Sequence, residues 1–230
     1  MAKHRVMGVD ACRAGWVGIV LTDDVAVAHF GESIATVVAD AEHDGAVTSL
    51  GIDIPIGLPD ESRREADRLA SAALGPRRAS VFLTPIRSAM AAPNLTDANR
   101  ISRQRTGLGV SAQAFALRAK VLEVDDWLRG TTLRVVEVHP ELSFAHLAGA
   151  ALKSRKATWA GAAQRRRLLA GAGIELPDDL GLAGAMAGVD DVLDAAAAAW
   201  SARRVATGDA QCLPDPPERF GDGLDAAIWT

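Results

Sequence analysis

The sequence predicts a mixed α/β fold, and three features of the chain support this prediction. Short runs of aliphatic residues come first, separated by turn residues, a pattern typical of antiparallel strands that follow one another closely. Later apolar runs alternate with long segments whose apolar residues recur at helical spacing. Hydrophobic residues make up 49% of the 230-residue chain and charged residues 23%, which is the balance of a globular protein.

Five segments have the composition of β-strands. The first three follow one another through short turns, so they are expected to form a meander. The fourth is a compact apolar run that contains Asp53 and stops at Pro55. A further short segment, residues 226–229, is expected either to add an edge strand or to pack down. The five strands are predicted at residues 6–9, 16–21, 25–30, 50–54 and 133–138.

Five other segments show helical spacing or helix-capping residues. Ser33 is a favourable N-cap for the first helix. The stretch from Arg77 to Gly109 has no regular pattern and is interpreted as a substrate-side insertion. A single domain over residues 1–230, with a helical and loop insertion at about 60–130, is therefore expected. The helices are predicted at residues 33–40, 61–74, 111–128, 158–170 and 189–206.

Composition and charge restrict the class of protein. The N-terminus lacks the apolar core of a secretory signal, and no apolar stretch reaches the roughly 20 residues of a membrane-spanning helix. Cys12 and Cys212 are expected to stay reduced, so a cytoplasmic protein without a membrane partner is predicted. The net charge of −4 argues against a broad wrap around nucleic acid. Local basic clusters, such as Lys153 with Arg155 and Lys156, are most simply solvated helix faces.

Acidic residues end several of the predicted strands and open the last helix. Asp10 ends the first strand, Asp53 the fourth and Glu137 the fifth. Asp191 and Asp194 lie three residues apart on one side of the last helix. Because ligands in open α/β sheets bind at the carboxyl ends of strands, these acids are expected to share one rim. Crowded carboxylates repel unless a cation joins them, and Mg²⁺ or Mn²⁺ takes oxygen ligands, so a divalent-metal site is predicted.

Each acid also has a structural interpretation. Asp10 precedes a turn, where Asp commonly hydrogen-bonds its own backbone. Glu137 alternates with valines and could face solvent, whereas Asp53 lies between isoleucines, where an unpartnered carboxylate would be costly. Asp190 lies where an acid caps a helix, so it is ranked below the others. A functional role is favoured for Asp53 and, on the helix, for Asp194, which borders the predicted core face.

Five sequence motifs, taken together, resemble a known family. They are GVDACRAGW, GIDIPIGLP, GPRRASVF, VVEVHPELSF and GVDDVLDAAAAAW, and they span nearly the whole chain. In their order and co-occurrence they look like the predicted-nuclease family catalogued as domain-of-unknown-function family 429. That family is assigned to the RNase H-like superfamily, and its acid pattern is similar to that of RuvC-type Holliday-junction resolvases. The resemblance implies a five-stranded mixed sheet of order 3-2-1-4-5, with three antiparallel strands followed by two parallel ones and helices on both faces.

The resemblance also implies a site and an activity. Asp10 matches the first-strand aspartate, and either Asp53 or Glu137 matches the central-strand acid. Asp191 and Asp194 match the D-x-x-D-A motif on the last helix. The implied protein is a nuclease that hydrolyses the phosphodiester bonds of DNA or RNA, with Mg²⁺ or Mn²⁺ held by these carboxylates.

Three other residues are candidates for substrate binding. Arg77 and Arg78 lie in the insertion and could grip a phosphate, although a solvated loop explains them equally well. His139 lies beyond the end of the fifth strand, where it could position water or metal. Pro140 beside it could equally shape an ordinary turn.

Two other functions fit the same sequence. One is an ATP-binding phosphotransferase of related fold, but the chain has room for one such domain and lacks a G-x-x-x-x-G-K-[ST] phosphate loop, so a homodimer would be needed. The other is a non-catalytic binding or scaffold protein that retains the fold. In the scaffold case the acids would point apart or pair with arginines.

Overall fold

The computed structural model describes residues 4–23 and 25–230. By their internal contacts the residues divide into two compact units. The first unit comprises Met1–Ile54, Thr131–Gln211 and Trp229–Thr230, and the second comprises Pro55–Gly130 and Cys212–Ile228. The second unit contains the predicted insertion, and the prediction of a single folded domain stays a prediction.

The first unit is built on five strands that pair in the predicted directions. β1 is antiparallel to β2, and β2 is antiparallel to β3. β1 is parallel to β4, and β4 is parallel to β5. These strands are β1 (Arg5–Cys12), β2 (Gly15–Thr22), β3 (Val25–Gly31), β4 (Ser49–Ile52) and β5 (Val135–Val138).

The sheet has more strands than the sequence predicted. Its order is β3-β2-β1-β4-β5-β7-β6, so the prediction of five strands is wrong and the sheet has seven. The added strands are β6 (Cys212–Arg219) and β7 (Asp225–Trp229). β7 is the segment that was expected either to add an edge strand or to pack down; it is a strand, but it lies between β5 and β6 and not at the edge. β6 was missed because it contains Pro214, Pro216 and Pro217, which read as loop residues. Proline cannot donate a ladder hydrogen bond, which fits the position of β6 at the edge of the sheet.

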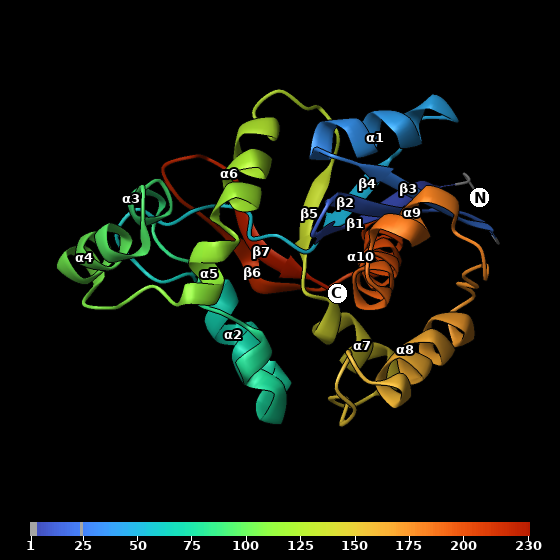
Figure 1. Ribbon diagram of the computed structural model, residues 1–230. Helices are drawn as coiled ribbons and strands as arrows, with labels where there is room; N and C mark the ends of the chain where they lie inside the picture. The colour runs from blue at the N-terminus through green and yellow to red at the C-terminus, as the bar shows by residue number, and fades with distance from the viewer. Residues whose placement is uncertain (1–3, 24) are drawn as a thin grey trace. The chain divides into compact units, whose positions relative to one another are not determined.

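Close packing of a helix on the sheet depends on two glycines. The helix is α10 (Val189–Thr207), which lies across β1 and β4 (Figure 1). A Cβ atom on Gly8 would lie 2.0 Å from the backbone nitrogen of Ala199, and one on Gly51 would lie 2.5 Å from the carbonyl oxygen of Ala198. A larger side chain on either strand would therefore push the helix away. The small side chains of the alanines in α10 let its backbone come this close to the strands.

The opposite face of the sheet is covered by α1 (Ile34–His43) (Figure 1). The Ser33 hydroxyl caps this helix by accepting a hydrogen bond from the Thr36 backbone nitrogen at 3.1 Å, as predicted. A Cβ atom on Gly18 of β2 would lie 3.3 Å from a methyl group of Val37 in α1. Helices therefore cover both faces of the sheet in this unit.

Three more helices complete the first unit, and their apolar side chains join those of β1, β2 and α10 in one core cluster. No helix in the described part of the chain is long and apolar enough to cross a membrane. Cys12 and Cys212 are both buried and form no disulfide in the described part of the chain. The three helices are α7 (Pro140–Ala148), α8 (Trp159–Gly171) and α9 (Gly181–Met186).

The second unit is largely helical. Part of the stretch predicted to be irregular forms a helix, α4, which Asn94 caps by accepting a hydrogen bond from the Asp97 backbone nitrogen at 2.9 Å. Its polar sequence gives little hydrophobic periodicity, which is why the prediction was wrong. The single helix predicted at residues 111–128 is two helices that meet at Leu117. The elements are α2 (Glu65–Leu74), the 3-10 helix η1 (Gly75–Ser80), α3 (Arg87–Met90), α4 (Leu95–Thr106), α5 (Ala112–Ala116) and α6 (Arg118–Trp127).

Candidate metal centre

Three aspartates from three elements of the first unit converge at one point. Asp10 lies near the end of β1, Asp53 directly follows β4, and Asp194 lies in the second turn of α10. One carboxylate oxygen from each lies within 4.8 Å of the other two. Asp10 is 7% exposed and Asp194 2% exposed, while Asp53 is partly exposed. We call these three residues the Asp cluster.

Strand register explains why the two strand aspartates meet. Val9 of β1 pairs with Ile52 of β4, so Asp10 and Asp53 occupy the next step of neighbouring parallel strands. The Asp53 backbone nitrogen donates a hydrogen bond to the Val9 carbonyl oxygen at 3.1 Å, which continues the ladder to this step. Because side chains alternate along a strand, both aspartates lie on the face that carries Gly8, and this is the face against α10.

The same register separates Glu137 from the cluster. Glu137 of β5 pairs with Ile52, not with Asp53, so its side chain leaves the opposite face of the sheet. It is 5% exposed and does not belong to the group of converging carboxylates. Of the two candidates for the central acid, the structure brings Asp53 and not Glu137 to Asp10 and Asp194.

A lysine lies against the Asp cluster. Lys156 Nζ donates a hydrogen bond to Asp194 Oδ2 at 2.5 Å and lies 3.6 Å from Asp190 Oδ2. Asp190 is therefore close to the cluster, but its partner is the lysine and its side chain is 36% exposed. The three clustered carboxylates and one ammonium, when ionised, leave two net negative charges, which is the charge that a divalent cation neutralises.

The aspartates of the cluster have raised pKa values. Removal from water raises the pKa of Asp10, and the charges of Asp53 and Asp194 raise it further. Desolvation raises the pKa of Asp53 and that of Asp194 to about 7, although the Lys156 ammonium opposes both shifts. Desolvation by itself would lower the pKa of Lys156, but the charge of Asp194 raises it. Desolvation is thus the largest influence on all three carboxyl groups, and the nearby ammonium of Lys156 offsets only part of it.

One oxygen of the cluster has no partner. Asp194 Oδ1 is buried and accepts no hydrogen bond from the residues that the structure describes. A buried carboxylate oxygen in this state is costly unless a hydrogen bond or a cation satisfies it. Asp10 is better served, because the Ala11 backbone nitrogen donates to its Oδ1 at 2.7 Å. Carboxylate oxygens are the ligands that Mg²⁺ and Mn²⁺ favour, so the donor set fits a hard divalent cation.

Asp191 lies beside the cluster and caps its own helix. Its Oδ2 accepts a hydrogen bond from the Gly188 backbone nitrogen at 3.0 Å. Desolvation raises the pKa of Asp191, and its charge contributes to the raised pKa of Asp10. Asp191 is thus an electrostatic neighbour of the Asp cluster but not one of the three converging ligands.

α7 places a second buried acid near the cluster, with a cation of its own. Glu141 forms an ion pair with Arg165 of α8, whose side chain is completely buried. The charge of Glu141 contributes to the raised pKa values of Asp53 and Asp194. His139 is the N-cap residue of the same helix and is partly buried.

The two arginines predicted to bind substrate belong to the second unit. Arg77 and Arg78 lie on η1, where the Arg77 carbonyl oxygen accepts a hydrogen bond from the Ser80 hydroxyl at 2.9 Å. Arg78 is exposed and Arg77 is partly buried. Their role in substrate binding stays a prediction.

Sequence reasoning missed Lys156 as a residue of the site. It grouped this lysine with the exposed side chains of Lys153 and Arg155, because nothing in the local pattern separates the three. Its distance of 38 residues from Asp194 left no spacing signal either. Only the fold brings them together.

No curated protein and no solved structure matches the chain. One family model matches residues 8–219, which include every member of the Asp cluster. The chain therefore belongs to the family described as a protein of unknown function (DUF429).

Proposed function

We propose that the chain is a divalent-metal-dependent nuclease that hydrolyses phosphodiester bonds. The observation that carries the proposal is the convergence of Asp10, Asp53 and Asp194 with a buried, unpartnered oxygen on Asp194. These three carboxylates would hold Mg²⁺ or Mn²⁺. When bound, such an ion activates water and polarises a phosphoryl oxygen.

The surrounding residues support phosphoryl chemistry by position and charge. Lys156 neutralises part of the cluster, and its ammonium would offset negative charge that develops on a phosphate bound beside Asp194. α10 fixes Asp194 against the sheet, because its alanines pack directly on the glycines of β1 and β4. The ligands therefore come from rigid elements, which favours a fixed geometry.

The arrangement favours this proposal over the scaffold alternative. Acids retained only for structure would be expected to point apart or to pair with arginines. The Asp cluster instead converges, and among the residues that the structure describes its ion-pair partner is one lysine, Lys156, which pairs with Asp194. The ATP-dependent alternative draws no support from any described residue.

Metal binding and cleavage test the proposal separately. Calorimetric titration of Mn²⁺ into the wild-type chain should show saturable binding that Asp10→Asn and Asp53→Asn abolish. A labelled oligonucleotide should be cleaved by the wild type with Mn²⁺ and left intact by both variants. Asp178→Asn is the matched control, because Asp178 belongs to the same unit and its side chain is 97% exposed. Metal binding without cleavage of DNA or RNA would contradict the nuclease proposal, and no metal binding would contradict the site.

A further inference from the structure

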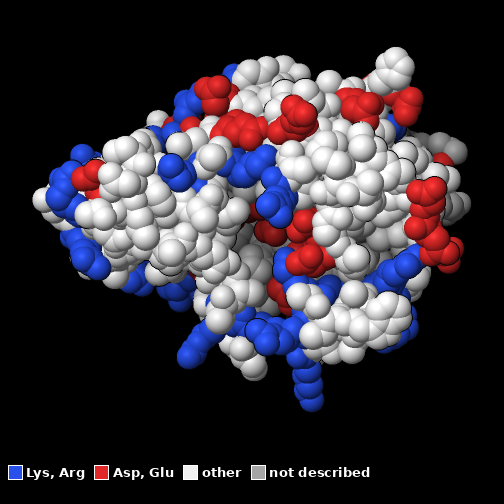
Figure 2. Space-filling model, in the orientation of Figure 1, with Lys and Arg blue, Asp and Glu red and all other residues white. Residues whose placement is uncertain are grey.

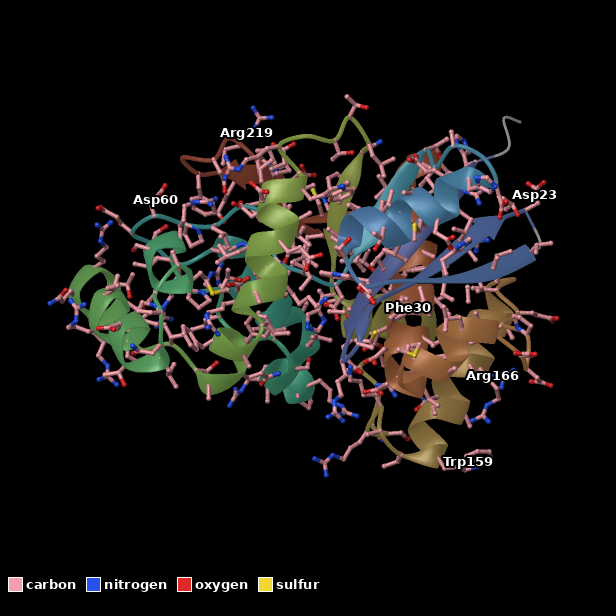
Figure 3. All side chains as sticks on the ribbon, turned by 45° about the horizontal axis from the view of Figure 1, so that its top comes forward. Asp23, Phe30, Asp60, Trp159, Arg166 and Arg219 are labelled. Atoms are coloured by element: carbon pink, nitrogen blue, oxygen red, sulfur yellow. The ribbon has the colours of Figure 1, made fainter. Side chains whose placement is uncertain are left out.

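An exposed tryptophan lies three residues after Lys156, the lysine that pairs with Asp194 of the Asp cluster. Trp159 is the first residue of α8 and is 90% exposed, more than any other large apolar side chain in the described part of the chain. Its side chain extends into solvent at the end of the helix (Figure 3). Three residues span at most about 11 Å, so the backbone of Trp159 lies within that distance of the backbone of Lys156, whose ammonium pairs with Asp194.

The segment that carries Trp159 is strongly basic, in a chain whose net charge is −4. Residues 142–174 contain six Lys and Arg and no Asp or Glu. Lys153, Arg155 and Arg167 are exposed, and no ion pair joins them to an acid among the residues that the structure describes. Lys and Arg side chains border the surface formed by α7 and α8 (Figure 2). The surface around the indole is therefore positively charged.

The backbone under the tryptophan is held in place. The Thr158 hydroxyl accepts a hydrogen bond from the Gly161 backbone nitrogen at 3.1 Å and donates one to the Arg155 carbonyl oxygen at 2.8 Å. A Cβ atom on Gly161 would lie 1.9 Å from that carbonyl oxygen, so the first turn of α8 packs directly on the loop. The buried Arg165 also donates to the Ser154 carbonyl oxygen at 3.4 Å. Trp159 is thus presented on an ordered support.

We propose that Trp159, Lys153 and Arg155 bind single-stranded nucleic acid, with the indole stacked on an unpaired base and the cations on the flanking phosphates. This inference rests on the proposed function, because it names the substrate class of the Asp cluster. Aromatic stacking combined with a basic surface is the general way in which proteins hold single strands. A paired base inside a duplex stacks on a neighbour at each face, so only the two ends of a duplex offer the indole a free face.

The positive charge of this surface favours a nucleic acid over a second copy of the chain as its binding partner. An exposed tryptophan is also common at protein interfaces. Two copies meeting through this face would bring their basic segments together, and like charges at an interface oppose association. The same positive charges attract the phosphates of a nucleic acid and so strengthen its binding.

Equilibrium binding of labelled oligonucleotides tests the proposal without cleavage. Fluorescence anisotropy is measured in EDTA with oligo-dT, oligo-rU and a blunt DNA duplex of equal length. We expect Trp159→Ala to weaken single-strand binding about 10-fold, and Trp159→Phe to keep most of the affinity because a phenyl ring also stacks. Arg155→Ala should lower the slope of log affinity against log salt by about 1. The dT and rU arms show whether DNA or RNA supplies the unpaired base.

Leu182→Ala is the matched control, since Leu182 belongs to the same unit and is 64% exposed. It should leave oligonucleotide binding unchanged. The proposal is overturned if Trp159→Ala binds single strands as the wild type does, or if it weakens duplex binding equally. It is also overturned if sedimentation shows that Trp159→Ala only dissociates a dimer. Single-strand binding that depends on Trp159 would stand even if Mn²⁺-dependent cleavage were absent, so the two proposals can fail separately.

Discussion

The Asp cluster of the first unit differs in its charge partners from a pair of buried acids in the second unit. In the second unit, Asp125 and Asp222 both bind Arg87, at 2.6 Å and 2.7 Å, and the Asp222 side chain is completely buried. Asp125 also receives a hydrogen bond from Arg129 at 2.9 Å. In the first unit, the three carboxylates of the Asp cluster have the single ammonium of Lys156 beside them.

The pKa values express this difference. Desolvation acts to raise the pKa of Asp125, but hydrogen bonds from Arg87 and Arg129 lower it below its usual value. Desolvation raises the pKa of Asp53 to about 7, because the opposing charge of Lys156 is too small an influence. Burial with paired arginines indicates a structural role, whereas burial with a shortage of cations indicates a site that a ligand completes.

Removing the shared arginine of the second unit should have the largest effect. Arg87→Ala leaves Asp125 with one exposed partner, Arg129. It leaves Asp222 with two backbone donors, the Leu58 nitrogen at 2.9 Å and the Leu224 nitrogen at 3.0 Å. We expect a loss of about 3–5 kcal/mol in the free energy of unfolding of this unit, because the buried carboxylate of Asp222 loses its cationic partner and that of Asp125 keeps only the exposed Arg129. Urea denaturation, together with amide hydrogen exchange in α6, measures the loss.

Arg129→Ala is the matched control for that experiment. Arg129 contacts the same Asp125, but its side chain is 52% exposed. Its removal should cost less than about 1 kcal/mol. If Arg87→Ala were no more destabilising than Arg129→Ala, the structural interpretation of the second unit's acids would be wrong.

Neutralising one aspartate of the first unit should increase the free energy of unfolding, whereas Arg87→Ala decreases it. The folded pKa of Asp53, about 7, lies above the unfolded value of about 3.9. Stability from this group is therefore fully present below the unfolded pKa and is lost as pH rises through about 7. The asparagine of Asp53→Asn does not ionise, so the variant keeps this stability at high pH. At pH 8 in EDTA it should be more stable than the wild type by on the order of 2 kcal/mol.

Melting temperature as a function of pH in EDTA measures this effect. The wild type should lose stability between about pH 4 and 8 relative to Asp53→Asn, and Asp178→Asn should follow the wild type. Added Mn²⁺ should stabilise the wild type increasingly at higher pH, because a metal binds the ionised carboxylates. Parallel pH profiles for the wild type and Asp53→Asn would contradict this prediction, because they would show that ionisation of the desolvated Asp53 does not destabilise the folded state.

Local pattern was enough to predict much of the architecture. The meander, the parallel strands and the long helix follow from hydrophobic periodicity and turn residues, which act over a few residues. β6 and α4 escaped because prolines and polar residues conceal their periodicity. The added strands of the sheet depend on pairings between distant segments, which no local signal carries.

The residues of the site also divide into those that local patterns predict and those that depend on distant pairings. Asp10 and Asp194 could be named from their places at a strand end and a helix start. The choice between Asp53 and Glu137 depends on which residue pairs with Ile52, so it needed the register of β4 and β5. A shift of one residue moves a side chain to the other face of the sheet, and sequence patterns leave strand ends uncertain by more than that.

Substitution of Lys156 should have the smallest effect. It tests directly whether the Asp cluster has too few cationic partners. Lys156→Met removes the ammonium from Asp194 while keeping a long side chain, so the Asp cluster faces a divalent cation with an additional uncompensated negative charge. We expect Mn²⁺ to bind about 10-fold more tightly, equivalent to about 1.4 kcal/mol, while the metal-free protein becomes less stable. Lys153→Met should change neither property, because Lys153 is exposed. Calorimetry and melting in EDTA measure the two changes, and weaker Mn²⁺ binding by Lys156→Met would mean that the lysine supports the metal site instead of competing with the metal for its charge.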